Sequence, residues 1–241
     1  MTLLQSGLAK SLAEDYTIDQ SLRFEDGDPD YLTWTPASDG NRKTWTFSCW
    51  VKRGNITTAQ RIFGSQANAS HIYFESNDVI YVDIADSGSG SRTGGLTTSQ
   101  VFRDAGAWYH IVVAIDTTSP TGTLAGSSTD RMRLYVNGSQ VTSFGSTVVP
   151  AQDYESCFNE GGEQHSIGYR TSTQGSAGLA LDGYLAEVYF IDGQALDADS
   201  FGETDSATNQ WKPLDSDDVK DAVTFGTNGF YQKYAATELA N

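Results

Sequence analysis

The strongest constraint on the fold is a segment with apolar side chains on both faces, GAWYHIVVAID at residues 106–116. Its alternating side chains form two sets: Tyr109, Ile111, Val113 and Ile115 on one face, and Trp108, His110, Val112 and Ala114 on the other. A strand with two apolar faces must be covered on both, so we expect it in the interior of a layered β structure. No Ser, Cys or carboxylate lies at a chemically meaningful spacing from His110 within the strand. We therefore interpret His110 as a packing or hydrogen-bonding residue.

Shorter runs with period-two alternation recur along the chain between turn residues. TWTFSCWVKRG predicts a half-buried strand that ends at Gly54, and HIYFESNDVIYVDI predicts two strands joined by a turn at residues 76–78. RMRLYVNGSQV predicts a hairpin with its turn at residues 137–138. A further strand follows the Asp-Gly pair at residues 182–183 and ends at the turn of residues 192–193.

Helical turns are expected only near residues 8–15 and at LDADSFG, where Asp197 can cap a first turn. Many short strands with glycine-rich turns predict an all-β fold, a two-sheet antiparallel sandwich or jelly roll. A chain of 241 residues fits one such domain. We divide it into an N-terminal docking arm (1–20), the sandwich (21–195) and an acidic, turn-rich tail (196–241). The tail is expected to pack on the sandwich or to link it to a further region.

The charge and hydropathy of the chain limit its partners and its location. Its formal net charge is −16, so nucleic acid and anionic membrane surfaces would repel it. No apolar run approaches the roughly 18 residues that a membrane-spanning helix needs. The first residues, MTLLQSGLAKSLAED, lack the apolar core of a signal peptide. We therefore expect the chain in a cytoplasm, either by itself or as part of a larger assembly that forms there. Cys49 and Cys157 are then expected to be free, buried thiols.

Five segments occur in an order that resembles a known family: SLRFEDGDPDYLTW, TFSCWVKRG, WYHIVVAID, RLYVNG and LDGYLAEVYFIDGQAL. This series is similar to the laminin-G-like and pentraxin-like branch of the concanavalin-A-like lectin/glucanase superfamily, over residues 21 to about 197. The resemblance implies a jelly-roll sandwich of two antiparallel sheets.

A narrower resemblance concerns both ends of the chain. Structural proteins of tailed bacteriophages, especially marine ones, contain sequences similar to two segments of this chain, LLQSGLAKSLAEDYTIDQSLRFEDGD and GTNGFYQKYAATELAN. This resemblance implies a tail-fibre, head-fibre or decoration component located in the virion. It also implies other virion proteins as partners and, by analogy with fibres, a homotrimer.

Two features of pentraxins do not carry over. Their strand disulfide needs a second cysteine where this chain has Val112 and Val113, and their acidic calcium loop corresponds to SIGYRTSTQG, where Arg170 replaces an acid. A calcium ion is kept only as an alternative, with the candidate ligands Asp26, Asp28, Asp30 and Asp182. An EF-hand is excluded, because its sixth and twelfth positions would be Tyr31 and Ala37, so we interpret these carboxylates first as turn formers.

The segment NEGGEQHSIGYR gathers the titratable side chains of Glu160, Glu163 and His165 beside Gln164. Glycanases of this superfamily carry a Glu-x-Asp-x-x-Glu pattern on one strand, and retention needs two carboxylates about 5 Å apart. The pattern is absent, and the two glutamates flank a Gly-Gly loop, so we predict no catalytic residue and no cofactor.

Aromatic side chains give the remaining candidates. We select Trp50, Tyr169 and Arg170 as glycan or interface residues, because aromatic rings stack on sugars and are enriched at interfaces. For Trp50, which lies on the polar face of its strand, packing under a loop or in a subunit interface is favoured over sugar binding.

Three functions follow from these observations. The first is a non-enzymatic virion structural protein that acts through protein–protein contacts, with residues 1–20 as a docking arm that orders on binding. The second is a glycan-binding module that recognises a receptor on the cell surface. The third is a glycoside hydrolase or lyase, against which the missing carboxylate pattern argues.

Overall fold

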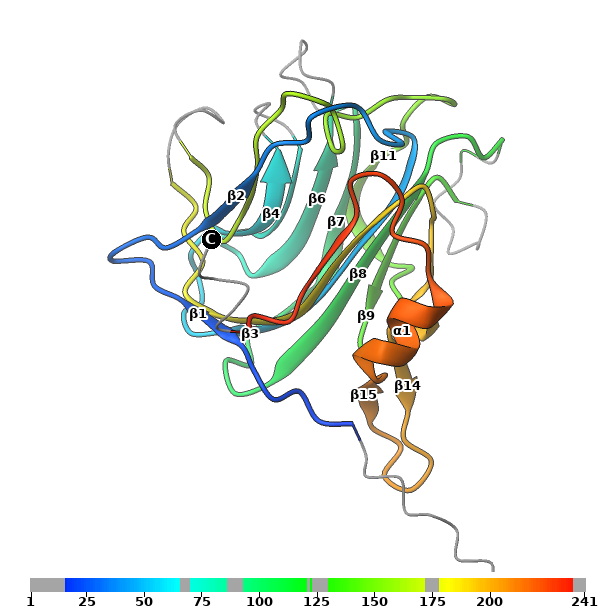
Figure 1. The fold of residues 1–241 in the computed structure, drawn as a ribbon. Coiled ribbons are helices and arrows are strands. Elements are labelled where there is room, and N and C mark those ends of the chain that lie inside the picture. Colours follow the sequence, from blue (N-terminus) through cyan, green and yellow to red (C-terminus); the bar gives the residue numbers. More distant parts are fainter. Residues whose placement is uncertain are drawn as a thin grey trace, which may run out of the picture.

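The computed structural model describes residues 16–65, 70–85, 93–120, 122, 130–171 and 178–235. Two seven-stranded antiparallel sheets face each other (Figure 1). Sheet A contains, in spatial order, β1 (Leu22–Phe24), β13 (Gly183–Asp192), β3 (Thr44–Arg53), β8 (Trp108–Asp116), β9 (Met132–Val136) and β10 (Ser139–Gln140), and β16 (Phe230–Gln232) pairs with β13. Sheet B contains β11 (Phe144–Val148), β7 (Gly94–Val101), β6 (Val79–Ile84), β5 (His71–Phe74), β4 (Gln60–Ser65), β12 (His165–Ile167) and β2 (Leu32–Trp34). The predicted all-β, two-sheet antiparallel sandwich is confirmed.

The core between the sheets is built from large aromatic and aliphatic side chains. The rings of Phe47 on β3 and Phe63 on β4 stack with their centroids 4.7 Å apart, so they join the two sheets. Phe158 extends the stack, with its ring centroid 5.2 Å from that of Phe63. Because successive side chains of a strand point to opposite faces, each strand contributes only alternate residues to this core.

The outer face of sheet A is also covered, which corrects the prediction of a half-buried β3. Residues beyond 195 fold back over this face as η2 (Ala198–Ser200), the hairpin of β14 (Gly202–Thr204) and β15 (Trp211–Pro213), and α1 (Ser216–Ala222). A second apolar cluster forms there, in which Val112 and Tyr189 pack with Phe201 and Val219. Figure 1 shows α1 and the hairpin beside β8 and β9. The segment after residue 195 is therefore a covering layer, and its β16 is a strand of sheet A.

The predicted turns and thiols are found in place. The turn between β9 and β10 has Asn137 at φ 48° and Gly138 at φ 79°, the left-handed pair that a two-residue hairpin needs. The predicted strands on either side of residues 76–78 are β5 and β6, and the strand after Asp182-Gly183 is β13. Cys49 and Cys157 are free and buried, as predicted.

Helical structure differs in part from the expectation. A short 3₁₀ turn follows Asp197, but the Asp197 side chain makes no capping hydrogen bond. The helix α1 was not predicted; its N-cap is Asp215, whose carboxylate accepts from the backbone N–H of Asp217. The expected turn at residues 8–15 lies outside the described residues. None of the helices in the described ranges has the length and apolar character needed to cross a bilayer.

Candidate functional site

His110 lies on the outer face of sheet A, near the start of β8, and is bonded on both ring nitrogens. The indole N–H of Trp211 donates to Nδ1 of His110 at 2.9 Å. Because an indole can only donate, Nδ1 must be the acceptor and Nε2 must carry the proton, which it donates to Oγ of Ser48 at 2.9 Å. Burial lowers the pKa of His110 to about 3, so the ring stays neutral near pH 7. The structural role predicted for His110 is confirmed.

The rings of Trp50 and Trp211 both contact this imidazole. The Trp50 ring stacks on His110 with centroids 4.9 Å apart and an interplanar angle of 21°. The indole of Trp211 meets the imidazole at its edge, through the hydrogen bond to Nδ1, with centroids 5.9 Å apart and an interplanar angle of 22°. The imidazole therefore holds Trp50 by stacking and Trp211 by a hydrogen bond. Trp50, on the supposedly polar face of β3, is only 7% exposed.

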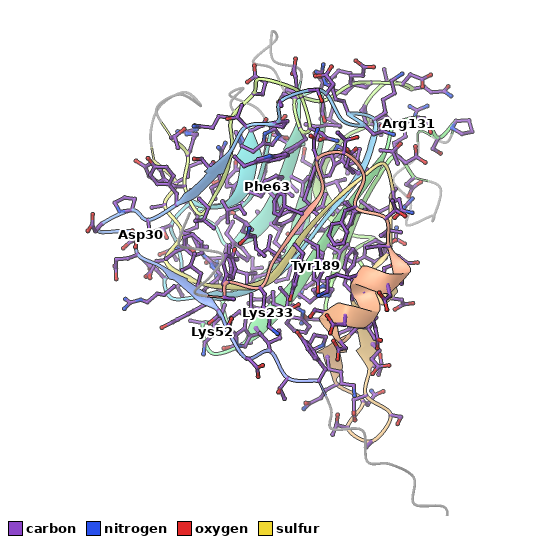
Figure 2. All side chains as sticks on the ribbon, in the orientation of Figure 1. Asp30, Lys52, Phe63, Arg131, Tyr189 and Lys233 are labelled. Carbon is purple, nitrogen blue, oxygen red and sulfur yellow. The ribbon has the colours of Figure 1, made fainter. Side chains whose placement is uncertain are left out.

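A groove of about 450 Å³ lies against this aromatic stack, and we call it the tryptophan groove. Its walls are the indoles of Trp50, Trp108 and Trp211, the residues that follow Trp211 on β15, and the chain segment 16–21. The side chain of Trp108 shares this face because Trp108 pairs with Lys52 and His110 pairs with Trp50 across β3 and β8. In Figure 2, Lys52 marks the end of sheet A near which the groove lies. Polar side chains of Thr17, Asp19, Gln20 and Ser21 are exposed on segment 16–21.

Segment 16–21 is held over sheet A by a buried carboxylate. Glu187 is 2% exposed and accepts hydrogen bonds from the hydroxyls of Tyr16 at 3.0 Å, Tyr189 at 2.8 Å and Tyr231 at 2.8 and 2.9 Å. Glu187 has φ 48°, at a bulge in the pairing of β13 with β3 that turns its side chain to the outer face. Burial, followed by the nearby carboxylate, raises the pKa of Tyr189 well above its ordinary value. Our sequence analysis did not identify this cluster, because its members are far apart along the chain.

The candidate calcium ligands do not form a cluster. Asp26, Asp28 and Asp30 are exposed in the loop between β1 and β2, and Figure 2 shows Asp30 at its tip, away from Tyr189. Burial first, and then the charges of Asp26 and Glu25, raise the pKa of Asp182. Within the described ranges, no three acidic, histidine or cysteine side chains converge in a way that could hold a metal ion.

Tyr169 and Arg170 lie apart from Trp50. They follow β12 of sheet B, where the Tyr169 ring stacks on that of Tyr31 with centroids 5.4 Å apart. Tyr31 is 48% exposed, so this pair forms an aromatic patch on the edge of sheet B. The backbone of Arg170 pairs with Gly178, and residues 172–177 of the same loop lie outside the described residues. The structure thus does not bring the three selected residues into one site.

The acidic cluster after residue 159 is bonded within the protein. Glu160 pairs with Arg42 at 2.9 Å, and burial, with the charge of Glu160 second, raises the pKa of Glu163. His165 accepts the backbone N–H of Asn159 on Nε2 and donates from Nδ1 to the carbonyl of Glu163. Burial lowers the pKa of His165 to about 4. Neither glutamate lines the tryptophan groove.

Several solved structures are similar to this chain. A pentraxin from Limulus polyphemus is 17% identical with a TM-score of 0.49, and the match covers 73% of this chain and 76% of the pentraxin. A protein from Bacteroides ovatus is 13% identical with a TM-score of 0.54, and the match covers 85% of this chain and 50% of that one. Domains LG4-5 of the mouse laminin α1 chain are 12% identical with a TM-score of 0.47, covering 81% and 44%. The chain therefore spans half or less of the last two proteins.

No curated protein matches the chain. Residues 26–200, most of its length, match the family described as the Concanavalin A-like lectin/glucanases superfamily. That range begins in the acidic loop after β1, includes both sheets apart from β1 and β16, and ends at η2. The chain belongs to the concanavalin A-like lectin/glucanase superfamily, with a sandwich of the laminin-G type.

Proposed function

We propose that this chain is a non-catalytic saccharide-binding module and that the tryptophan groove is its binding site. The observation that carries the proposal is the pair of indoles, Trp50 and Trp108, side by side on the outer face of sheet A beside an exposed polar segment. The C–H faces of a sugar ring pack on aromatic rings, while its hydroxyls need hydrogen-bond partners at the rim. Asp19 and Gln20 line the groove, and they supply a carboxylate acceptor and an amide that can both donate and accept.

The size and rigidity of the groove fit this ligand class. Its volume of about 450 Å³ lies in the range of ligand pockets, roughly 300–1,000 Å³. The hydrogen bonds of His110 hold Trp211 in place, so little side-chain ordering remains to be done on binding. The Bacteroides ovatus relative is titled a "putative carbohydrate binding protein", which makes saccharides the first ligands to test here.

The proposal includes no catalytic step. Hydrolysis of a glycosidic bond needs a pair of carboxylic groups around the bond. Of the groove residues that the structure describes, only Asp19 carries a carboxylate. A bound saccharide would therefore be held and released unchanged.

Calorimetric titration with a panel of plant, algal and bacterial-surface oligosaccharides tests this function. We expect saturable binding and an affinity loss of about tenfold in Trp108→Ala, which corresponds to about 1.4 kcal/mol. The matched control is Tyr31→Ala, which removes an exposed aromatic ring from sheet B and should bind as the unchanged protein does. No binding by the whole panel, or equal losses in both variants, would contradict the proposal.

A second candidate function is that of a virion structural component, with the sandwich as an assembly unit. It is supported by the resemblance of both chain ends to tailed-phage proteins and by β11, which is an edge strand of sheet B among the described residues. The edge strand β11 lies within residues 134–152, which contain no charged side chain although the chain carries a net charge of −16. Copies of this chain carry the same net charge and repel each other, but two uncharged edge strands can still approach and pair. Antibody labelling of intact phage particles tests the location, and particles that lack the chain would exclude it.

A further inference from the structure

A second cavity lies at an edge of the sandwich, between the two sheets. It opens between β16 of sheet A and the strands β2 and β12 of sheet B, and its volume is about 300 Å³. We call it the edge pocket. The tryptophan groove lies on the outer face of sheet A and shares no lining residue with it.

The walls of the edge pocket are aromatic rings in mutual contact. Trp34 lies with its ring centroid 4.8 Å from that of His165 and 5.5 Å from that of Phe230, the latter edge-to-face. Phe63, which belongs to the central core, forms part of the lining. The pocket therefore reaches from the surface to the core and presents ring faces and edges to whatever occupies it.

Three polar side chains of the wall, those of His165, Ser166 and Asn228, are already bonded to the protein. Both ring nitrogens of His165 are engaged, as described above. Oγ of Ser166 donates to the carbonyl of Tyr169 at 2.6 Å, and Nδ2 of Asn228 donates to Oδ1 of Asn159 at 2.8 Å. These groups cannot serve the many hydroxyls of a sugar without breaking bonds within the protein.

Gln232 differs from these three residues. It lies on β16, where Phe230 packs on the central core and Tyr231 on the outer cluster, so strand alternation turns Gln232 inward with Phe230. The amide oxygen Oε1 of Gln232 is buried and accepts no hydrogen bond in the described structure. A buried acceptor left without a donor costs about 1–3 kcal/mol, so such an atom at a pocket wall is a position where a ligand donor gains affinity.

We propose that the edge pocket binds a small, flat, aromatic molecule that carries a single N–H or O–H donor. The rings of Trp34 and Phe230 pack on the ligand ring, and Oε1 of Gln232 accepts its hydrogen. A cavity of roughly 150 Å³ lined by apolar side chains holds benzene. A volume of about 300 Å³ therefore suits a molecule of one or two rings, such as an indole or a phenol.

Calorimetry and ligand-observed NMR with the full chain test this site, using indole and 1-methylindole as the probes. The two probes differ by the one N–H donor, so we expect indole to bind about tenfold more tightly, the factor for a hydrogen bond of about 1.4 kcal/mol. Gln232→Met keeps the side-chain length and removes the acceptor, and it should bind both probes equally. The matched control, Gln210→Met, changes an exposed residue of the β14–β15 turn and should keep the tenfold preference.

A second variant locates the binding without relying on Gln232. Ala37 is exposed at the pocket lining, so Ala37→Trp should fill the mouth and remove indole binding while the folded spectrum is kept. Absence of saturable indole binding, equal affinity of the two probes for the unchanged protein, or indole binding unaffected by Ala37→Trp would each overturn the proposal. Saccharide binding in the tryptophan groove is measured separately, so either site can fail without the other.

Discussion

Tyr16 and Glu187 are 171 positions apart in the sequence and joined by one hydrogen bond, from the phenol hydroxyl to the buried carboxylate at 3.0 Å. This bond fixes the start of segment 16–21 to the bulge of β13. Since that segment forms one wall of the tryptophan groove, the position of a groove wall depends on a contact made far from any tryptophan.

Tyr16→Phe should weaken this attachment while keeping the aromatic ring. We expect a loss of about 1–2 kcal/mol in the free energy of unfolding, the contribution of one hydrogen bond to a charged acceptor. Urea denaturation followed by tryptophan fluorescence measures it. Tyr31→Phe, an exposed tyrosine on sheet B, is the control and should change little. A loss of the same size in the control would mean that the hydrogen bond to Glu187 stabilises the protein no more than an exposed hydroxyl does.

Gly138→Ala should disturb the groove from the hairpin side. An added Cβ at Gly138 would overlap the ring of Trp211, and φ there is 79°. Gly162 has φ 81° with no atom within 4 Å of its Cβ position, so Gly162→Ala carries the backbone strain alone. We expect Gly138→Ala to lose more stability than Gly162→Ala and to shift the indole N–H resonance of Trp211. If the two variants lose the same stability and neither shifts the Trp211 resonance, the ring of Trp211 does not pack against Gly138.

Acid should destabilise the protein well above the pH at which ordinary carboxylates titrate. Burial lowers the pKa of His71 and His110 to about 3 and that of His165 to about 4, against 6.5 for an exposed histidine. The unfolded chain therefore binds more protons than the folded one between pH 6.5 and about 4, so stability falls as the pH falls through this range.

In this pH range, each of these histidines lowers the free energy of unfolding by up to about 1.4 kcal/mol for each unit by which the pH falls. Denaturant unfolding at pH 7.5, 6 and 5 measures the trend, and NMR titration of the imidazole protons measures the pKa values directly. A histidine that titrates above pH 5.5 in the folded protein would show that its ring is not enclosed as found here.

The position of β11 at the edge of sheet B, as far as the structure describes the chain, predicts self-association by strand pairing. Thr147 is exposed on this strand, so Thr147→Lys should place a charge on the edge of each copy and prevent pairing. Thr204→Lys, exposed on β14, is the matched control and should assemble as the unchanged protein does. Light scattering after gel filtration compares the three. If the unchanged protein is a monomer at all concentrations, it does not self-associate through β11. If the unchanged protein and both variants assemble equally, the contact between copies lies away from β11.

The sequence predicted the sandwich well, because alternation and turn chemistry are local signals. The interior position of β8 followed from its two apolar faces, and the Asn137-Gly138 turn from its demand for positive φ. The covered outer face of β3 was missed for a physical reason. Its cover comes from residues 196–235, whose short strands and turns show no alternation long enough to predict a layer.

The candidate site was predicted only in part. Trp50 was selected because a large aromatic ring on a polar face needs an explanation, and the structure supplies one in His110 and the groove. Trp108 stands two positions before His110 on a face that the alternation marks as apolar, so it was interpreted as a packing residue of its strand. Trp211 could not be predicted, because nothing near it in the sequence indicates that β15 packs against β8.

The arrangement of β1 and β16 has a consequence for engineering. Both strands pair with the same side of β13, β1 with residues 183–185 and β16 with residues 188–190, and both run antiparallel to it. The end of β16 therefore points toward the beginning of β1 across Glu187. A linker that joins the two ends of the described chain, with new termini opened at the exposed turn of residues 206–209, would give a circularly permuted protein in which β1 and β16 keep their places beside β13.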